Sequence, residues 1–190
     1  SFPTRRSSDL VSAMLTKVAQ RVGLLHRVGR QLSLKARRMF LTQVILPQLD
    51  YASPVFSPGV SAGDLLALQR AERKALRAVF RLPPWESADP LYSQLEVKPL
   101  LERWSSQRLL QVHKIHAGSS PSAVQSLLTP LASQSSRSTR QASLNFLPPR
   151  SQRRHLRNSF ICKAVEEWNQ LPVHIKSLPF SQFKAALTSL

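Results

Sequence analysis

The sequence predicts an all-α fold, a helical bundle followed by a flexible basic linker and a small C-terminal helical segment. Apolar residues recur at spacings of three and four along most of the chain, and no stretch alternates convincingly between polar and apolar residues. Ser, Gly and Pro stand where such helices would begin or end. Apolar residues make up 42% of the 190 residues, which is enough for a packed core.

The first predicted helix covers residues 12–28. It carries an apolar stripe, and Gly29 is placed to end it. The stripe comprises Leu15, Val18, Val22 and Leu25. The preceding stretch SFPTRRSSDL, residues 1–10, matches no helix or strand in composition and looks like the translation of a sequencing adapter. We therefore expect these ten residues to lie outside the fold and the chain to be a fragment of a longer protein.

A second predicted helix begins after Ser33, which can cap it, and is stopped by Pro47. Its buried face is expected to comprise Leu34, Phe40, Leu41, Val44 and Ile45, and its solvent face Lys35, Arg37 and Arg38. The following stretch, LDYASPVFSPG at 49–59, has the Pro, Ser and Gly content of a loop. It is too apolar to stay in solvent, so we expect it to pack through Leu49, Tyr51, Val55 and Phe56.

The clearest helix signals lie between Ser61 and Arg81. Ser61 followed by Asp64 is a capping-box pattern, and Pro83 and Pro84 stop the helix. Its apolar side is formed by Leu65, Leu68, Ala75, Leu76 and Val79, and the opposite side by Arg70, Lys74, Arg77 and Arg81. We call these four basic residues the cationic row.

Like charges four residues apart destabilise a helix by a few tenths of a kcal/mol per pair, so the cationic row favours a polyanion lying against it. A purely solvated face is the open alternative. Glu72 falls on the apolar side of the same helix and should need a cationic partner there.

Further helices are predicted at 87–96 and 98–117, with a short segment at 121–128. The helix at 98–117 has Pro99 in its first turn and an apolar face of Leu101, Trp104, Leu109, Val112 and Ile115. Residues 129–150 are rich in Ser, Gln, Arg, Thr and Pro, which predicts a flexible or extended linker between domains at 11–128 and 151–190.

Two helices are expected beyond the linker, separated by Pro172. The first has Phe160, Ala164 and Trp168 on its inner face. The last would be capped by Ser177 or Ser181 and would turn Phe183, Leu187 and Leu190 inward.

The charge balance points to a polyanionic partner. Lys and Arg number 27 against 10 Asp and Glu, which gives a net charge of +17 and a pI of about 11.6. Because Arg predominates and suits phosphate oxygens, nucleic acid is favoured over an anionic membrane surface. A merely solubilising charge is the alternative.

No apolar run approaches a membrane span, and a lone cysteine excludes an internal disulfide. We therefore expect an intracellular protein of the nucleus and cytoplasm.

No residues form a recognisable catalytic or metal-binding constellation. Asp50, Asp64 and Asp89 lie in different elements with no second acid beside them, although polymerases need clustered carboxylates for two metal ions. Glu166 and Glu167 are interpreted as solubilising residues that pair locally with Lys163.

The remaining candidates for chemistry are weaker still. His113 and His116 could share a metal but have no further ligand nearby, and are expected to be exposed or partly buried helix residues. Cys162 is interpreted as a small core residue. There is no glycine-rich phosphate loop and no nucleophile elbow. We therefore predict neither catalytic nor metal residues, and no activity from this chain alone.

Three stretches carry a resemblance to a known family. They are LSLKARRMFLTQVILPQLDYASPVF, LLALQRAERKALRAVF, and SFICKAVEEWNQLPVHI with FSQFKAAL. In this order, over residues 12–190, they resemble the region after the catalytic palm in reverse transcriptases of LINE-type, non-LTR retrotransposons. The chain departs from the family pattern at Ala52, where Gly is usual, and at Phe56, where Trp is usual.

The resemblance implies a fragment of an RNA-directed DNA polymerase, namely its helical thumb and a basic C-terminal extension. Its partners would be template RNA, a DNA primer or target, and the upstream palm of the same full-length protein, with no membrane. The family's metal-binding aspartates would lie in that palm, so Mg²⁺ is expected there and no cofactor in this chain.

We expect the cationic row to contact backbone phosphates, with further contacts from residues before and after it. These further residues are Lys35, Arg38, Arg150, Arg153, Arg154 and Arg157. Two other classes of function stay open. One is a stand-alone basic helical RNA-binding module, and the other is a protein-interaction scaffold that would expose Trp104, Trp168 and Phe183.

Overall fold

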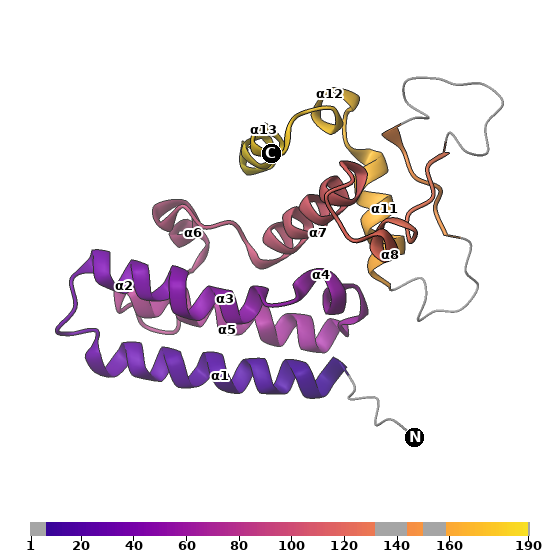
Figure 1. The fold of residues 1–190 in the computed structure, drawn as a ribbon. Coiled ribbons are helices and arrows are strands. Elements are labelled where there is room, and N and C mark those ends of the chain that lie inside the picture. Colours follow the sequence, from indigo (N-terminus) through magenta and orange to yellow (C-terminus); the bar gives the residue numbers. More distant parts are fainter. Residues whose placement is uncertain (1–6, 132–143, 150–158, 190) are drawn as a thin grey trace. The chain divides into compact units, whose positions relative to one another are not determined.

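The computed structural model describes residues 7–131, 144–149 and 159–189. Within these ranges the regular structure is helical, and the one exception is an isolated antiparallel bridge between Pro130 and Phe146 (Figure 1). This confirms the all-α helical prediction. The chain forms two compact units, which we call the first unit (Ser1–Ser53 with Val60–Arg103) and the second unit (Pro54–Gly59 with Trp104–Leu190).

The first unit begins with helix α1 (Ser7–Val28), which packs against α5 (Ala62–Phe80). The expectation that residues 1–10 lie outside the fold is wrong for 7–10, because α1 already begins at Ser7. Extending a formed helix costs little, since each added residue gains a backbone hydrogen bond. Residues 1–6 lie outside the described part. The buried stripe of α1 is Val11, Met14, Val18, Val22 and Leu25, so Met14 takes the place predicted for Leu15.

Gly29 ends α1 as predicted. Its backbone N–H donates to the Leu25 carbonyl at 2.8 Å, and a Cβ at position 29 would collide with that oxygen. A side chain would therefore force the chain to leave the helix along another path.

The next helical stretch consists of α2 (Leu34–Phe40), a π-helical turn (Leu41–Ile45) and α3 (Leu46–Asp50). Ser33 caps α2 as predicted, by accepting from the Ala36 N–H at 3.2 Å. The prediction that Pro47 stops this helix is wrong, because Pro47 lies in the first turn of α3. A π turn widens the backbone just before the proline, which gives its ring room and tolerates its missing N–H.

Two predictions of burial, for Leu34 and for part of the stretch 49–59, are wrong. Leu34 was expected inside but is 47% exposed at the first position of α2. The stretch 49–59 is less irregular than expected, since α4 (Ser53–Phe56) and a 3-10 turn (Ser57–Gly59) follow α3. Its Leu49 and Phe56 are buried as expected, but Tyr51 and Val55 are each 74% exposed.

Helix α5 follows its predicted bounds closely. The Ser61 hydroxyl accepts from the Asp64 N–H at 3.1 Å and donates to the Asp64 carboxylate at 2.9 Å. Arg81 ends the helix in the left-handed conformation, at φ 60°. The buried face comprises Leu68, Ala75, Leu76 and Val79 as predicted, with Glu72 and Ala78 beside them and Leu65 half-buried.

Helix α6 (Asp89–Leu95) and the start of α7 (Leu100–His116) complete the first unit. Leu91, Leu95 and Leu100 are buried there. Leu101, predicted on the apolar face of α7, is 46% exposed instead.

The second unit contains most of α7 together with α8 (Ser122–Gln125), α11 (Phe160–Gln170), α12 (Val173–Lys176) and α13 (Phe180–Ser189). Its core is aromatic and aliphatic, with Trp168 and Phe183 fully buried at its centre. The other core members from these helices include Leu109, Val112, Ile115, Ala164, Val165, Ile175 and Leu187.

Residues 144–149 contradict part of the predicted linker, because they pack into this core. Phe146 is buried, and the Asn169 side chain accepts from its N–H at 3.1 Å and donates to its carbonyl at 2.8 Å. The Trp168 indole N–H donates to the Leu144 carbonyl at 2.8 Å. Averaged over 129–150, the polar composition hides this short apolar stretch. Residues 132–143 and 150–158 lie outside the described part.

Neither serine proposed as a cap begins α13. The Ser177 hydroxyl donates to the His174 carbonyl, and the first backbone bond of α13 runs from the Phe183 N–H to the Pro179 carbonyl at 2.8 Å. Phe183 and Leu187 face the core as predicted, whereas Leu190 lies outside the described residues. None of the helices in the described ranges combines the length and apolar character that a membrane crossing requires.

Candidate nucleic-acid interface

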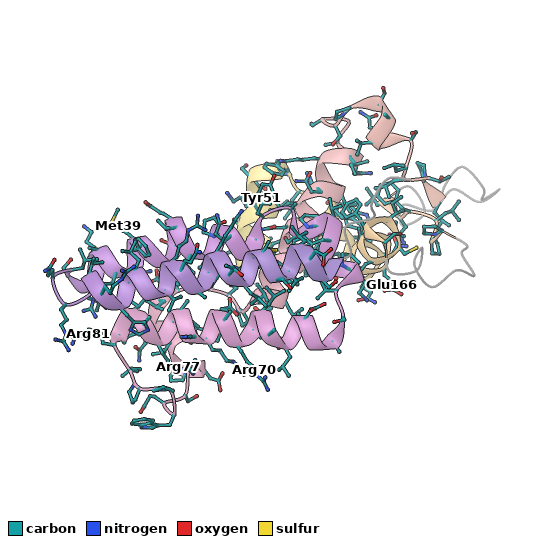
Figure 2. All side chains as sticks on the ribbon, turned by 90° about the horizontal axis from the view of Figure 1, so that it is seen from below. Met39, Tyr51, Arg70, Arg77, Arg81 and Glu166 are labelled. Carbon is teal, nitrogen blue, oxygen red and sulfur yellow. The ribbon has the colours of Figure 1, made fainter. Side chains whose placement is uncertain are left out.

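The cationic row lies on the solvent side of α5. Arg70, Lys74 and Arg81 are exposed and Arg77 is half-buried, while the opposite side of the helix is buried in the first unit. Figure 2 shows Arg70 and Arg77 along one edge of α5, with Arg81 at its end. At a rise of 1.5 Å per residue, the row extends over about 16 Å.

Within the described ranges, no acidic side chain pairs with a member of the row. Among the described residues, Arg70, Lys74 and Arg81 form no ion pair. Arg77 donates to a backbone carbonyl, that of Glu86, at 3.3 Å. The predicted geometry of an outward-facing cationic helix is therefore present.

The further predicted contact residues fare differently. Lys35 is exposed, as a phosphate contact requires. Arg38 instead donates to the Glu96 carboxylate at 2.5 Å, with the two side chains 41% and 80% exposed. A pair so exposed contributes little to stability, but it lowers the positive potential that Arg38 offers to a phosphate. Arg150, Arg153, Arg154 and Arg157 lie outside the described residues.

Glu72 has the cationic partner that the sequence demanded. Its carboxylate is 1% exposed and contacts the Arg103 guanidinium, and it accepts from the Tyr92 hydroxyl at 2.8 Å and the Leu100 N–H at 3.2 Å. Arg103 also binds Asp50, with its Nε 3.0 Å from Oδ2, and donates to the Lys98 carbonyl at 2.7 Å. Arg103 thus pairs with two carboxylates that lie far apart in the sequence.

This buried network fixes its own protonation states. Burial alone would lower the pKa of Arg103. The hydrogen bonds and the charge attraction that Arg103 forms with Asp50 and Glu72 outweigh burial, so its pKa is raised. Burial, followed by the charge of Glu72, raises the pKa of Tyr92 well above its ordinary value. The network joins α3, α5, α6 and the start of α7, and so supports the helix that carries the cationic row.

The second unit has an ion pair that sequence reasoning missed. The Arg108 guanidinium donates to both Glu167 oxygens, at 2.9 and 2.5 Å, and to the Ser57 hydroxyl at 2.6 Å. Glu167 was expected to pair locally, yet only Glu166 reaches Lys163, at 2.9 Å. Arg108 is buried on α7, and the signal available in the sequence was its place four residues after Trp104, on the predicted apolar side of the helix.

Lys176 is a second buried cation in this unit. Its ammonium donates to the Asn145 side chain at 2.8 Å and to the Asn169 carbonyl at 3.1 Å. Burial lowers the pKa of Lys176, because neutral amide oxygens compensate less for lost hydration than a carboxylate would.

The two histidines differ in burial, since His113 is buried and His116 is exposed as expected. His113 was expected to be exposed or partly buried but is buried, stacked on Phe183 with ring centroids 4.4 Å apart. Its Nε2 lies 2.8 Å from the Leu178 carbonyl, which can only accept, so this nitrogen carries the hydrogen. Burial, and then the charge of His113, lower the pKa of His116. The described residues contain no group of three or more His, Cys, Asp or Glu side chains that could hold a metal ion.

The aromatic residues proposed for a protein-binding face are not on the surface. Trp104, Trp168 and Phe183 are each at most 1% exposed, which contradicts the arrangement that the scaffold alternative requires. Comparison of the chain with protein-family models, curated proteins and solved structures found no match.

Proposed function

We propose that this chain is the thumb and post-thumb part of a LINE-type RNA-directed DNA polymerase, and that it grips the template–primer duplex through its phosphates. The observation that carries the proposal is the cationic row, exposed on one side of a helix whose other side is buried. The ordered motifs at 32–56, 65–80 and 159–187 support the assignment to that polymerase class.

The grip works by position and charge. A helix held by a packed core and by the Glu72–Arg103 network presents its cations at fixed spacing, so little backbone freedom has to be lost when phosphates bind. Each phosphate that is neutralised releases condensed counterions, which favours binding whatever the base sequence. Chemistry would take place in the palm of the full-length protein, where Mg²⁺ and the aspartates are expected.

The test replaces the row by neutral residues of similar size. In the variant Arg70→Gln, Lys74→Gln, Arg77→Gln, Arg81→Gln, we expect the plot of log Kd against log salt for an RNA–DNA hybrid to flatten by about 0.7 to 0.9 per lost phosphate contact. A matched control neutralises four exposed cations that do not belong to α5, namely Lys17, Arg27, Arg30 and Lys184.

The comparison of the two variants decides the proposal. A flatter slope for the row variant alone supports it, provided that thermal unfolding shows both variants folded. An equal change in both variants would mean that net charge, and not the row, governs binding. A stand-alone RNA-binding module would instead bind as tightly without the palm as with it, which titration of the joined and separate chains would reveal.

A further inference from the structure

Trp85 stands in solvent beside the cationic row. Its side chain is 84% exposed, more than any other large apolar residue of the described ranges. Among the aromatic contacts within those ranges, Trp85 takes part in none. Both other tryptophans, Trp104 and Trp168, are buried. An indole left in water forgoes the stabilisation that burial gives, so its exposure calls for an explanation.

The backbone that carries Trp85 is held in place. The Glu86 N–H donates to the Pro83 carbonyl at 3.2 Å, which closes a turn with Pro84 and Trp85 at its centre. Proline at the second position presets the backbone angle that such a turn needs. After the turn, Ala88 is buried, which anchors the chain again before α6. The indole is thus presented on a fixed support.

This turn is fastened directly to the row. The Arg77 guanidinium donates to the Glu86 carbonyl at 3.3 Å, and the Leu82 N–H donates to the Arg77 carbonyl at 3.0 Å. Arg81, the last member of the row, lies only four residues before Trp85. A phosphate strand that contacts Arg77 and Arg81 would therefore pass close to the indole.

We propose that Trp85 stacks on an unpaired base of a single-stranded segment whose phosphates contact Arg77 and Arg81. The inference rests on the proposed function and adds to it the kind of nucleic acid that meets this end of α5. Stacking on an aromatic side chain tolerates any base, since each base has a π face, and it requires that the base be free of a partner strand.

The surroundings favour a nucleic-acid strand over a lipid surface or a protein. Cations of the row supply the phosphate contacts, whereas the exposed Glu86 and Asp89 at the turn would repel an anionic membrane. Asp89 is itself held by Arg73, at 3.9 Å, and by the Ser87 hydroxyl, at 3.3 Å. Acids next to the indole also disfavour a phosphate at that point, so a base is the group that suits Trp85.

The test compares Trp85→Ala and Trp85→Phe in the full chain. The probes are a labelled oligouridine and a fully paired RNA–DNA hybrid of equal length. Replacing a stacking aromatic residue by alanine costs about 1–3 kcal/mol of binding free energy per base, so Trp85→Ala should raise the Kd for oligouridine by about 5- to 150-fold. Trp85→Phe should retain most of the affinity, and neither variant should change the Kd for the hybrid.

Tyr51→Ala is the matched control, since Tyr51 is an exposed aromatic residue of the same unit, away from the Arg70–Arg81 edge of α5 in Figure 2. We expect it to bind both probes like the unmodified chain. An unchanged Kd for oligouridine in Trp85→Ala overturns the inference, as does an equal loss in Tyr51→Ala. A blue shift of tryptophan fluorescence on anionic vesicles that is lost in Trp85→Phe, with no such change on oligouridine, would assign the residue to lipid and overturn the inference also.

The outcomes for the two proposals can be separated. If the row variant flattens the salt dependence while Trp85→Ala binds oligouridine normally, the stacking inference fails and the phosphate grip stands. If neither the row variant nor Trp85→Ala changes binding, both fail.

Discussion

Arg103 supplies the positive charge that pairs with the buried Glu72 carboxylate and the partly buried Asp50 carboxylate. Replacing it by Ala leaves Glu72 and Asp50 without their cation, and we expect the free energy of unfolding to fall by about 3–5 kcal/mol. Urea denaturation measures this change. The control is Arg73→Ala, which removes a long, exposed pair with Asp89 and an interaction with Tyr92, and should cost less than about 1 kcal/mol. Equal losses in the two variants would show that the network does not stabilise the first unit.

Lys176 should make stability depend on pH on the alkaline side. Burial lowers its pKa below the ordinary 10.5, so between the two values the unfolded chain binds the proton and the folded chain does not. Unfolding then becomes less favourable as pH rises through this interval. We expect this rise in the free energy of unfolding to be smaller in Lys176→Met, measured by denaturation at a series of pH values. An identical slope in both proteins would contradict the assignment.

At the scale of single residues, the sequence predicted which side chains needed a partner but rarely which partner they found. Glu72 on an apolar face had to be paired, and that demand is visible in the helical periodicity. Its partner Arg103 lies 31 residues further on, and only the tertiary fold brings the two together. Trp85 was not singled out, because exposure of one indole in a Pro-rich turn leaves no periodic signal.

At the scale of the elements, the cap of α5 offers a direct test. Ser61→Ala removes the acceptor for the Asp64 N–H and the donor to its carboxylate, and should cost about 1 kcal/mol of stability. Thermal or urea unfolding of the chain measures it. Ser181→Ala is the matched control, because this exposed serine lies inside α13 and does not cap it. A loss as large in Ser181→Ala would remove the special role of the cap.

Element ends that depend on local chemistry were predictable, and those that depend on packing were not. Ser33, Gly29 and Ser61 act within one turn of their own backbone, so their effects could be predicted from the sequence. Pro47 stays within a helical stretch because a π turn precedes it. Phe146 becomes part of the core through Asn169, more than 20 residues away, which no local composition could indicate.

At the scale of the whole molecule, only the structure distinguishes the cations that are paired with acids from those that are not. Several cations are paired with acids, among them Arg38, Arg103 and Arg108, whereas none of the four members of the cationic row forms an ion pair within the described ranges. The net charge alone predicted a polyanionic partner. Helical periodicity predicted which face of α5 would contact that partner. The salt-dependence experiment on the row variant tests that face at this scale.

The π-helical turn has a consequence for the straightness of a buried edge. In an ideal α-helix, residues four apart advance by about 400°, so Leu41, Ile45 and Leu49 would wander by about 40° at each step. All three are fully buried. A π turn has less rotation per residue than an α turn, so the turn at Leu41–Ile45 offsets part of this 40° drift. The three apolar side chains can therefore stay on the buried side of the helix. Asp50, whose carboxylate pairs with Arg103, is the next residue along this edge.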